Sequence, residues 1–237
     1  MKKRSGPRGF EQTRWSLVLR ANGASTQASR VALSELCRIY RAPLLAYTRC
    51  IVRDAMRAED IVQDFMTRII ERDILSAADP TRGRFRAFLQ TSMKHHVLNT
   101  IAAESAQKRG GDASFIDVNR MDVECDRASP EQLYARQCAW ELVGRAFARL
   151  REDQERRGHG AVFDALRERL VGDDDDATLR EEAGRLGMET VTIRVKLSRL
   201  RKYLGELIRE EVAQTVARPE DVDDELQELL AALRGAR

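Results

Sequence analysis

Apolar residues recur at helical spacing through most of this chain, and polar residues fill the positions between them. A predicted helix after Asp54 has apolar residues in pairs four positions apart, at Ile61, Val62, Phe65, Met66, Ile69 and Ile70. A later predicted helix has apolar residues at Phe85, Phe88, Leu89, Met93, Val97, Leu98 and Ile101. The composition is rich in Ala, Leu, Arg and Glu, which favour helices. We therefore predict an all-α protein.

Interruptions in this pattern divide the 237 residues into segments. The expected order is a basic arm (1–12), a first helical domain (13–106), a linker (107–130), a second helical domain (131–209) and an acidic amphipathic extension (210–237). The polar linker lacks sustained periodicity, and its roughly 24 residues exceed an ordinary connection inside one compact domain. We therefore expect two helical domains joined by a flexible linker.

The formal net charge of +3, from 41 basic and 38 acidic residues, hides a segregation of sign along the chain. Residues 81–110 carry a net charge of +5, as do residues 190–209, whereas residues 210–230 carry −7. Two separate basic stretches are typical of a protein that holds an acidic polymer at two places. A charge run is also often only a solvated face, so charge alone does not decide the function.

Residues 178–203 have the spacing of a helix-turn-helix motif. Ala183 stands where two helices would cross, and Gly187 stands where a tight turn needs a residue without a side chain. The packed side of the second helix is expected to consist of Val191, Ile193, Leu197 and Leu200. Outward-facing Arg, Lys and Thr side chains would then contact bases and phosphates of duplex DNA. An ordinary helical hairpin with a basic surface is the alternative.

The sequence contains none of the motifs that usually carry catalysis. It has no Gly-rich phosphate loop, no nucleophile elbow, no HExxH pattern and no convergent set of metal ligands. We therefore expect no enzymatic activity, no cofactor and no metal site. No apolar stretch has the length of a membrane span or signal peptide, so we expect a cytoplasmic protein without membrane attachment. The cysteines are expected to be small buried apolar residues: Cys37, Cys50, Cys125 and Cys138.

Three segments together resemble the sigma-70 class of bacterial transcription initiation factors, in particular the extracytoplasmic-function (ECF) type. Residues 58–65 (AEDIVQDF) are similar to the region-two motif, residues 84–89 (RFRAFL) to the start of the next helix, and residues 178–203 to region four. Further segments resemble a long branch of the family with N- and C-terminal extensions: residues 13–18, 107–111 and 212–216. The resemblance implies a sigma factor that binds core RNA polymerase, recognises the minus-thirty-five and minus-ten promoter elements, and promotes transcription initiation.

The resemblance also assigns residues to each partner. Those implied in binding the polymerase clamp are Glu59, Asp60, Gln63, Asp64 and Arg68. Those implied in binding single-stranded minus-ten DNA are Arg82, Arg84, Phe85, Arg86, Thr91, Lys94, His95 and Asn99. A flipped base would lie beside Phe85, while Phe88 is expected in the core. Those implied in reading the minus-thirty-five duplex are Thr190, Thr192, Arg194, Lys196, Arg199 and Arg201.

Two other functions stay open at this stage. A helix-turn-helix repressor or activator would bind palindromic sites without recruiting polymerase, and a helical adaptor would bind only protein. An anti-sigma factor also stays open as a regulator, as does self-inhibition by the acidic extension. In that hypothesis the extension, with Leu226, Leu229, Leu230 and Leu233 on one face, folds over the basic recognition helix. A solvated tail that packs on its own domain is the alternative.

Overall fold

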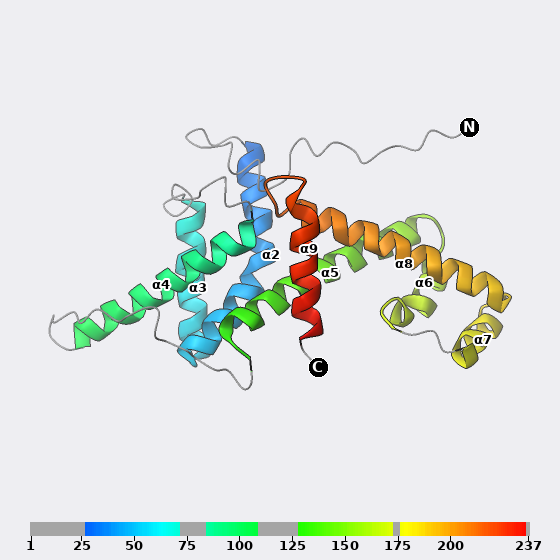
Figure 1. The fold of residues 1–237 in the computed structure, drawn as a ribbon, viewed down its shortest axis with the longest axis horizontal. Helices are drawn as coiled ribbons and strands as arrows, with labels where there is room; N and C mark the ends of the chain where they lie inside the picture. Colours follow the sequence, from blue (N-terminus) through cyan, green and yellow to red (C-terminus); the bar gives the residue numbers. More distant parts are fainter. Residues whose placement is uncertain (1–26, 72–83, 109–127, 173–175, 236–237) are drawn as a thin grey trace. The chain divides into compact units, whose positions relative to one another are not determined.

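The computed structural model describes residues 27–71, 84–108, 128–172 and 176–235, which are mostly helical (Figure 1). In chain order the helices are α2 (Gln27–Val52), α3 (Ala55–Ile70), α4 (Phe85–Lys108), α5 (Pro130–Arg156), α6 (Gly160–Leu166), the 3-10 helix η4 (Arg167–Arg169), α7 (Asp176–Arg185), α8 (Thr190–Ala213) and α9 (Asp221–Arg234). The described residues contain no strand beyond isolated bridging positions, such as Arg84 with Val216. The prediction of an all-α protein is confirmed. None of the described helices combines the length and the apolar character that a membrane span requires.

Contacts divide the chain into two compact units. The first unit comprises residues 1–141 and 212–237, and the second comprises residues 142–211. The acidic extension therefore belongs with the first helical segments of the chain. The predicted domain limits stay predictions, because the basic arm and most of the predicted linker lie outside the described residues.

The first unit is built around the packed apolar faces of α2, α3 and α4. The carboxylate of Asp54 accepts a hydrogen bond from the backbone N–H of Arg57 (2.9 Å) and so caps the start of α3. The apolar stripe of α3 is buried at Ala58, Ile61, Val62, Phe65, Met66 and Ile69. The largest fully buried side chains of the unit are aromatic and include Tyr40, Tyr47, Tyr134, Phe65 and Phe85. Because aromatic rings bury large apolar areas, this cluster holds the helices in place.

The second unit packs the second half of α5 with α6, α7 and α8 around one apolar core. The core residues are Ala146, Leu150, Phe163, Leu166, Leu170, Leu179, Ala183, Ile193, Leu197, Leu200, Leu204 and Leu207. A turn at Leu186 and Gly187 joins α7 to α8, and Gly187 has a φ of +63°. Only glycine adopts that left-handed conformation without steric cost, which explains the residue at this turn.

Two apolar residues that the helical patterns placed on buried faces are exposed instead. The exposed fractions are 65% for Val191 and 55% for Ile70. Ile70 is the last residue of α3. Val191 lies two positions before Ile193, and two residues turn an α-helix by about 200°, away from the buried stripe.

The cysteines only partly match their prediction. Cys37 and Cys138 are buried free thiols, but Cys50 is buried and disulfide-bonded. Burial is confirmed for these three residues, but the interpretation of Cys50 as a simple apolar residue is wrong, because spacing along the chain does not show which cysteines meet in space. Cys125 lies outside the described residues.

Candidate nucleic-acid interface

The outer face of α3 presents all five residues that the resemblance assigned to a protein partner. Burial of the apolar stripe leaves the other side of the helix in solvent. The exposed residues on that side are Glu59, Asp60, Gln63, Asp64 and Arg68. The face is therefore polar, mainly acidic and held on a rigid helix.

Two of these carboxylates interact with neighbouring helices. Glu59 accepts a hydrogen bond from Arg49 of α2 (2.8 Å), and both side chains are about half exposed. An Asp64 oxygen lies 3.3 Å from Nε2 of His96 on α4. Among the described residues, Asp60 makes no ion pair. Asp60 is thus the carboxylate of this face that stands most open to a partner.

His96 is the buried neighbour of this acidic face. Its side chain is 8% exposed, and Nε2 has no hydrogen-bond partner among the described residues. Burial lowers the pKa of His96 below 6.5, although the charge of Asp64 acts in the opposite direction. The imidazole is therefore neutral at pH 7.

The start of α4 differs from the exposed DNA-binding segment expected there. Phe85 is fully buried, with its ring edge-on to Tyr40 at a centroid distance of 5.2 Å and stacked on Phe88 at 6.3 Å. Phe88, expected in the core, is only half-buried. Phe85, rather than Phe88, takes the fully buried position, because α4 begins at Phe85 and its ring packs against Tyr40 of α2.

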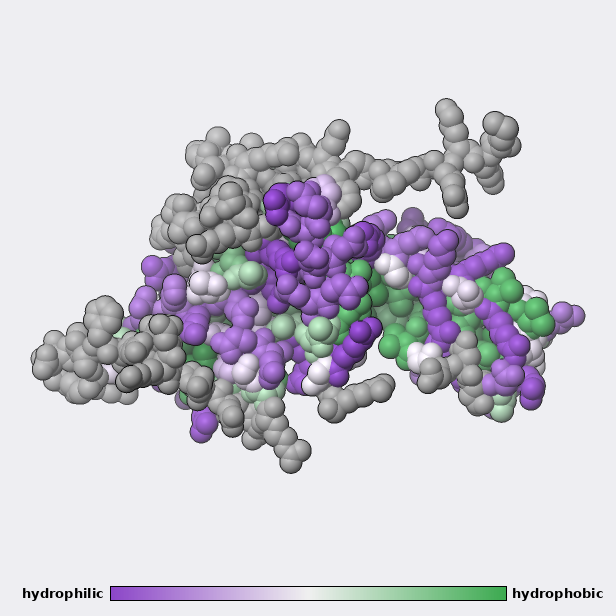
Figure 2. All heavy atoms as spheres, viewed as in Figure 1, coloured by the Kyte–Doolittle hydropathy of each residue, from purple (hydrophilic) through white to green (hydrophobic). Residues whose placement is uncertain are grey.

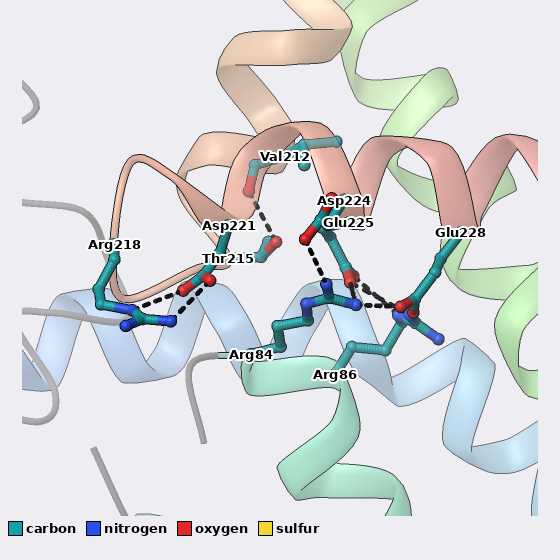
Figure 3. Close-up of polar contacts among 9 residues, drawn as sticks. All are labelled: Arg84, Arg86, Val212, Thr215, Arg218, Asp221, Asp224, Glu225 and Glu228. Atoms are coloured by element: carbon teal, nitrogen blue, oxygen red, sulfur yellow. Dashed lines mark hydrogen bonds and ion pairs between the residues drawn. The ribbon is translucent and has the colours of Figure 1, made fainter. Parts of the chain in front are cut away.

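Arg86 is buried as well, in contact with two carboxylates of α9 (Figure 3). Its Nε and one Nη donate to the two carboxylate oxygens of Glu225 at 2.7 and 3.1 Å. The same Nη donates to Glu228 at 2.5 Å. Burial opposes the charge of Arg86, but the hydrogen bonds and the charge of Glu225 outweigh it and raise the pKa of the guanidinium. Arg86 thus stays charged inside the unit.

Arg84 lies at the rim of the same cluster. It donates to Glu228, and its guanidinium is 3.5 Å from Glu225 and 3.8 Å from Asp224. Burial opposes the charge of Glu228, but Arg84 and Arg86 together hold the pKa of that carboxyl below its usual value. The side chains of Glu228 and Asp224 are 54% and 79% exposed, whereas Glu225 is fully buried. We call these five side chains, Arg84, Arg86, Asp224, Glu225 and Glu228, the arginine–acid cluster.

Backbone contacts fasten the extension to the same place. The N–H of Phe85 donates to the carbonyl of Thr215 at 3.1 Å, beside the bridge between Arg84 and Val216. Separately from the extension, the hydroxyl of Tyr134 on α5 donates to the carbonyl of Arg86 at 3.1 Å. A bidentate pair between Arg218 and Asp221 closes the loop before α9. Self-inhibition over the recognition helix was one of two hypotheses for the acidic helix; in the structure its carboxylates pair with the arginines at the start of α4.

The remaining residues assigned to the minus-ten strand lie farther along α4. Thr91, His95 and Asn99 are exposed and follow one another at four-residue intervals, so they lie on one side of the helix. Lys94 is half-buried beside them. Arg82 lies outside the described residues.

The first half of α8 carries the residues assigned to duplex DNA. Thr192, Arg194 and Arg199 are exposed, and Thr190 and Lys196 are half-buried. Arg194 donates to Asp176 at the start of α7 (2.6 Å). Arg201 differs from the others, because its guanidinium donates to the carbonyls of Arg169 and Gly172, each at 2.7 Å. These bonds tie α8 to the end of η4.

Val191 and Val195 also lie on the exposed surface of α8, at 65% and 44% exposure. The sequence contains a signal for them: the buried residues Ile193, Leu197, Leu200 and Leu204 fix the rotation of the helix and leave 191 and 195 outside. Valine methyl groups on such a helix are suited to contact the methyl group of thymine in a major groove.

A comparison with protein families matches part of the chain. Residues 36–107, from within α2 to the end of α4, match the family model described as Sigma-70 region 2. The match supports a sigma-70 family sigma factor with a role in transcription initiation. No curated protein and no solved structure matches the chain.

Proposed function

We propose that this chain is a cytoplasmic, non-enzymatic sigma factor of the ECF type that binds core RNA polymerase, directs it to promoters and helps to open the minus-ten region. The observation that carries the proposal is the match of residues 36–107 to Sigma-70 region 2, the segment that contains the exposed acidic face of α3. Core polymerase and promoter DNA are the proposed partners.

The face of α3 is the proposed polymerase contact. Its rigid helix and its acidic character suit a basic partner surface, because complementary charge raises the association rate and fixes register. Glu59 is engaged by Arg49, whereas Asp60 and Asp64 are the other two exposed carboxylates of this face. Asp60 and Asp64 are therefore the pair to test.

Promoter contacts are proposed on two helices. The exposed side of α4 at Thr91, Lys94, His95 and Asn99 would bind the open minus-ten strand, since polar and cationic side chains suit unpaired bases and their phosphates. The exposed part of α8 would read the minus-thirty-five duplex, with α7, the turn at Gly187 and α8 acting as a helix-turn-helix. In this assignment Phe85, Arg86 and Arg201 have structural roles.

The test is co-elution of the full chain with bacterial core RNA polymerase on size-exclusion chromatography. We expect the wild type to co-elute and Asp60→Ala with Asp64→Ala to lose most of the complex, because these substitutions remove the charge of the contact face. Glu181→Ala with Glu206→Ala removes the same charge from exposed positions of α7 and α8 and is the matched control. If the wild type elutes alone while it still binds duplex DNA, the sigma proposal fails and a helix-turn-helix repressor or activator takes its place.

A further inference from the structure

The arginine–acid cluster brings together residues that the sequence separates by 139 positions or more (Figure 3). It has an inner and an outer part. The inner part is the bidentate pair of Arg86 and Glu225, in which the Arg86 side chain is 9% exposed and that of Glu225 is 0% exposed. The outer part is Arg84 with Glu228 and Asp224, whose carboxylates reach solvent; Glu228 also accepts a hydrogen bond from Arg86 and so links the two parts.

The two parts differ in how easily they can open. Removing one partner of a buried pair leaves an uncompensated charge, which strongly destabilises the fold. Arg84 itself is only 20% exposed, but Glu228 and Asp224 are 54% and 79% exposed, and carboxylates in solvent are held weakly and are screened by salt. The inner pair therefore keeps α9 docked, while the outer carboxylates can leave Arg84 without undocking the helix.

The outer carboxylates also resemble a nucleic-acid backbone in chemistry. A guanidinium recognises carboxylate and phosphate with the same planar set of N–H donors. Arg84 immediately precedes α4, and the exposed residues Thr91, His95 and Asn99 lie farther along that helix. Figure 2 shows hydrophilic side chains over the first half of α9, a stretch whose sequence is mainly acidic. A strand that approached Arg84 would meet this acidic surface.

We infer that α9 is a built-in competitor of single-stranded nucleic acid: the carboxylates of Glu228 and Asp224 occupy the phosphate-binding position at Arg84. The identification of the strand as promoter DNA rests on the proposed function; the competition itself rests on the arginine–acid cluster. A polyanion releases counterions when it binds a cation, and the entropy gained by this release allows the polyanion to displace an exposed carboxylate. Glu228 thus sets a threshold for strand binding, and Glu225 keeps the helix in place.

The test uses the full chain and a fluorescein-labelled single-stranded oligodeoxynucleotide of mixed sequence, with fluorescence anisotropy measured over a range of salt concentrations. We expect Glu228→Gln to tighten binding by about 3- to 10-fold, the effect of one exposed ion pair and one relieved repulsion. The slope of affinity against salt should steepen by about one counterion, because Arg84 then contacts a phosphate. Glu220→Gln, which removes the same charge beside Arg218, is the matched control and should change binding less than about twofold.

Arg84→Ala completes a double-mutant cycle. The gain from Glu228→Gln should vanish when Arg84 is alanine, because the competed position is then absent. A gain that persists without Arg84, a Glu228→Gln effect no larger than that of Glu220→Gln, or a lack of oligonucleotide binding by all variants would each overturn the inference. Co-elution with polymerase is a separate readout: loss of co-elution with a retained Glu228 effect rejects the sigma proposal and leaves the competition standing.

Discussion

The two basic segments of this chain carry the same net charge but present it in different ways. In the first segment, the arginines at the start of α4 are covered by α9, and Arg86 is buried between carboxylates. In the second segment, Arg194 and Arg199 of α8 remain in solvent. Charge counted along a sequence therefore measures how many cations a segment has, and the fold decides how many of them a nucleic acid can reach.

The largest expected effect tests whether the covered segment is structural. Glu225→Gln leaves the buried Arg86 without its bidentate counter-charge, and breaking a buried pair in this way costs about 3–5 kcal/mol. We expect a loss of about 3 kcal/mol in the free energy of unfolding, near the lower end, because Glu228 still contacts Arg86. Urea denaturation followed by circular dichroism measures this loss.

A second variant separates charge from packing at the same position. Arg86→Met with Glu225→Leu removes both charges and keeps apolar volume, so it should recover most of the stability that Glu225→Gln loses. If Glu225→Gln is as stable as the wild type, the coverage of α4 by α9 is a weak association, and the two basic segments differ less than their burial indicates.

Substitutions at the exposed arginines of α8 should change DNA binding and leave stability nearly unchanged, the opposite of what we expect for Glu225→Gln. Arg199→Ala should weaken binding to a DNA duplex that was selected for binding by the full chain. If the guanidinium contacts a base, we expect a loss of about 1–3 kcal/mol in the binding free energy. If it contacts phosphate, the affinity should fall by the same factor for all sequences. The free energy of unfolding should stay within about 0.5 kcal/mol, because the side chain is exposed. Anisotropy titration and urea denaturation of the same preparation provide both quantities.

Arg201→Ala is the contrasting variant within α8. It removes two hydrogen bonds to backbone carbonyls, and bonds from a charged donor contribute about 1.5–3 kcal/mol each, less at a half-exposed site. We expect it to lower stability more than Arg199→Ala does. Equal stability of the two variants would show that Arg201 is as open to DNA as its neighbours.

The face of α3 could be predicted from the sequence because it depends on local periodicity alone. The paired apolar residues from Ile61 to Ile69 fix the buried side of the helix, and the opposite side follows from helix geometry. Gly187 could also be predicted, because the left-handed backbone conformation of a tight turn is a local property that favours glycine. Periodicity alone fails at Ile70, where the apolar pattern continues but the helix ends.

The covered arginines could not be predicted in this way. Arg86 is buried because Glu225, 139 positions away, supplies a matching carboxylate, and no local pattern contains that information. A charged residue near a helix start normally lies in solvent, and the family resemblance assigned Arg86 to DNA. The negative charge of the extension did indicate that it would be attracted to a basic segment. It did not show which of the two basic segments the acidic helix would join.

The smallest expected effect concerns His96, a second buried basic side chain of α4 that lacks the matched partner of Arg86. Burial lowers its pKa below 6.5, so the unfolded chain binds a proton that the folded chain does not. The stability that neutral His96 contributes is therefore present above about pH 6.5 and is lost as the pH falls through the folded pKa, by at most about 1.4 kcal/mol per pH unit. Asp64→Asn should enlarge this loss, because the carboxylate now favours the protonated ring. His96→Gln should flatten the dependence of urea midpoints on pH in this range. A wild type whose midpoint rises on acidification would mean that Asp64 pairs with the imidazolium, and that His96 resembles Arg86 after all.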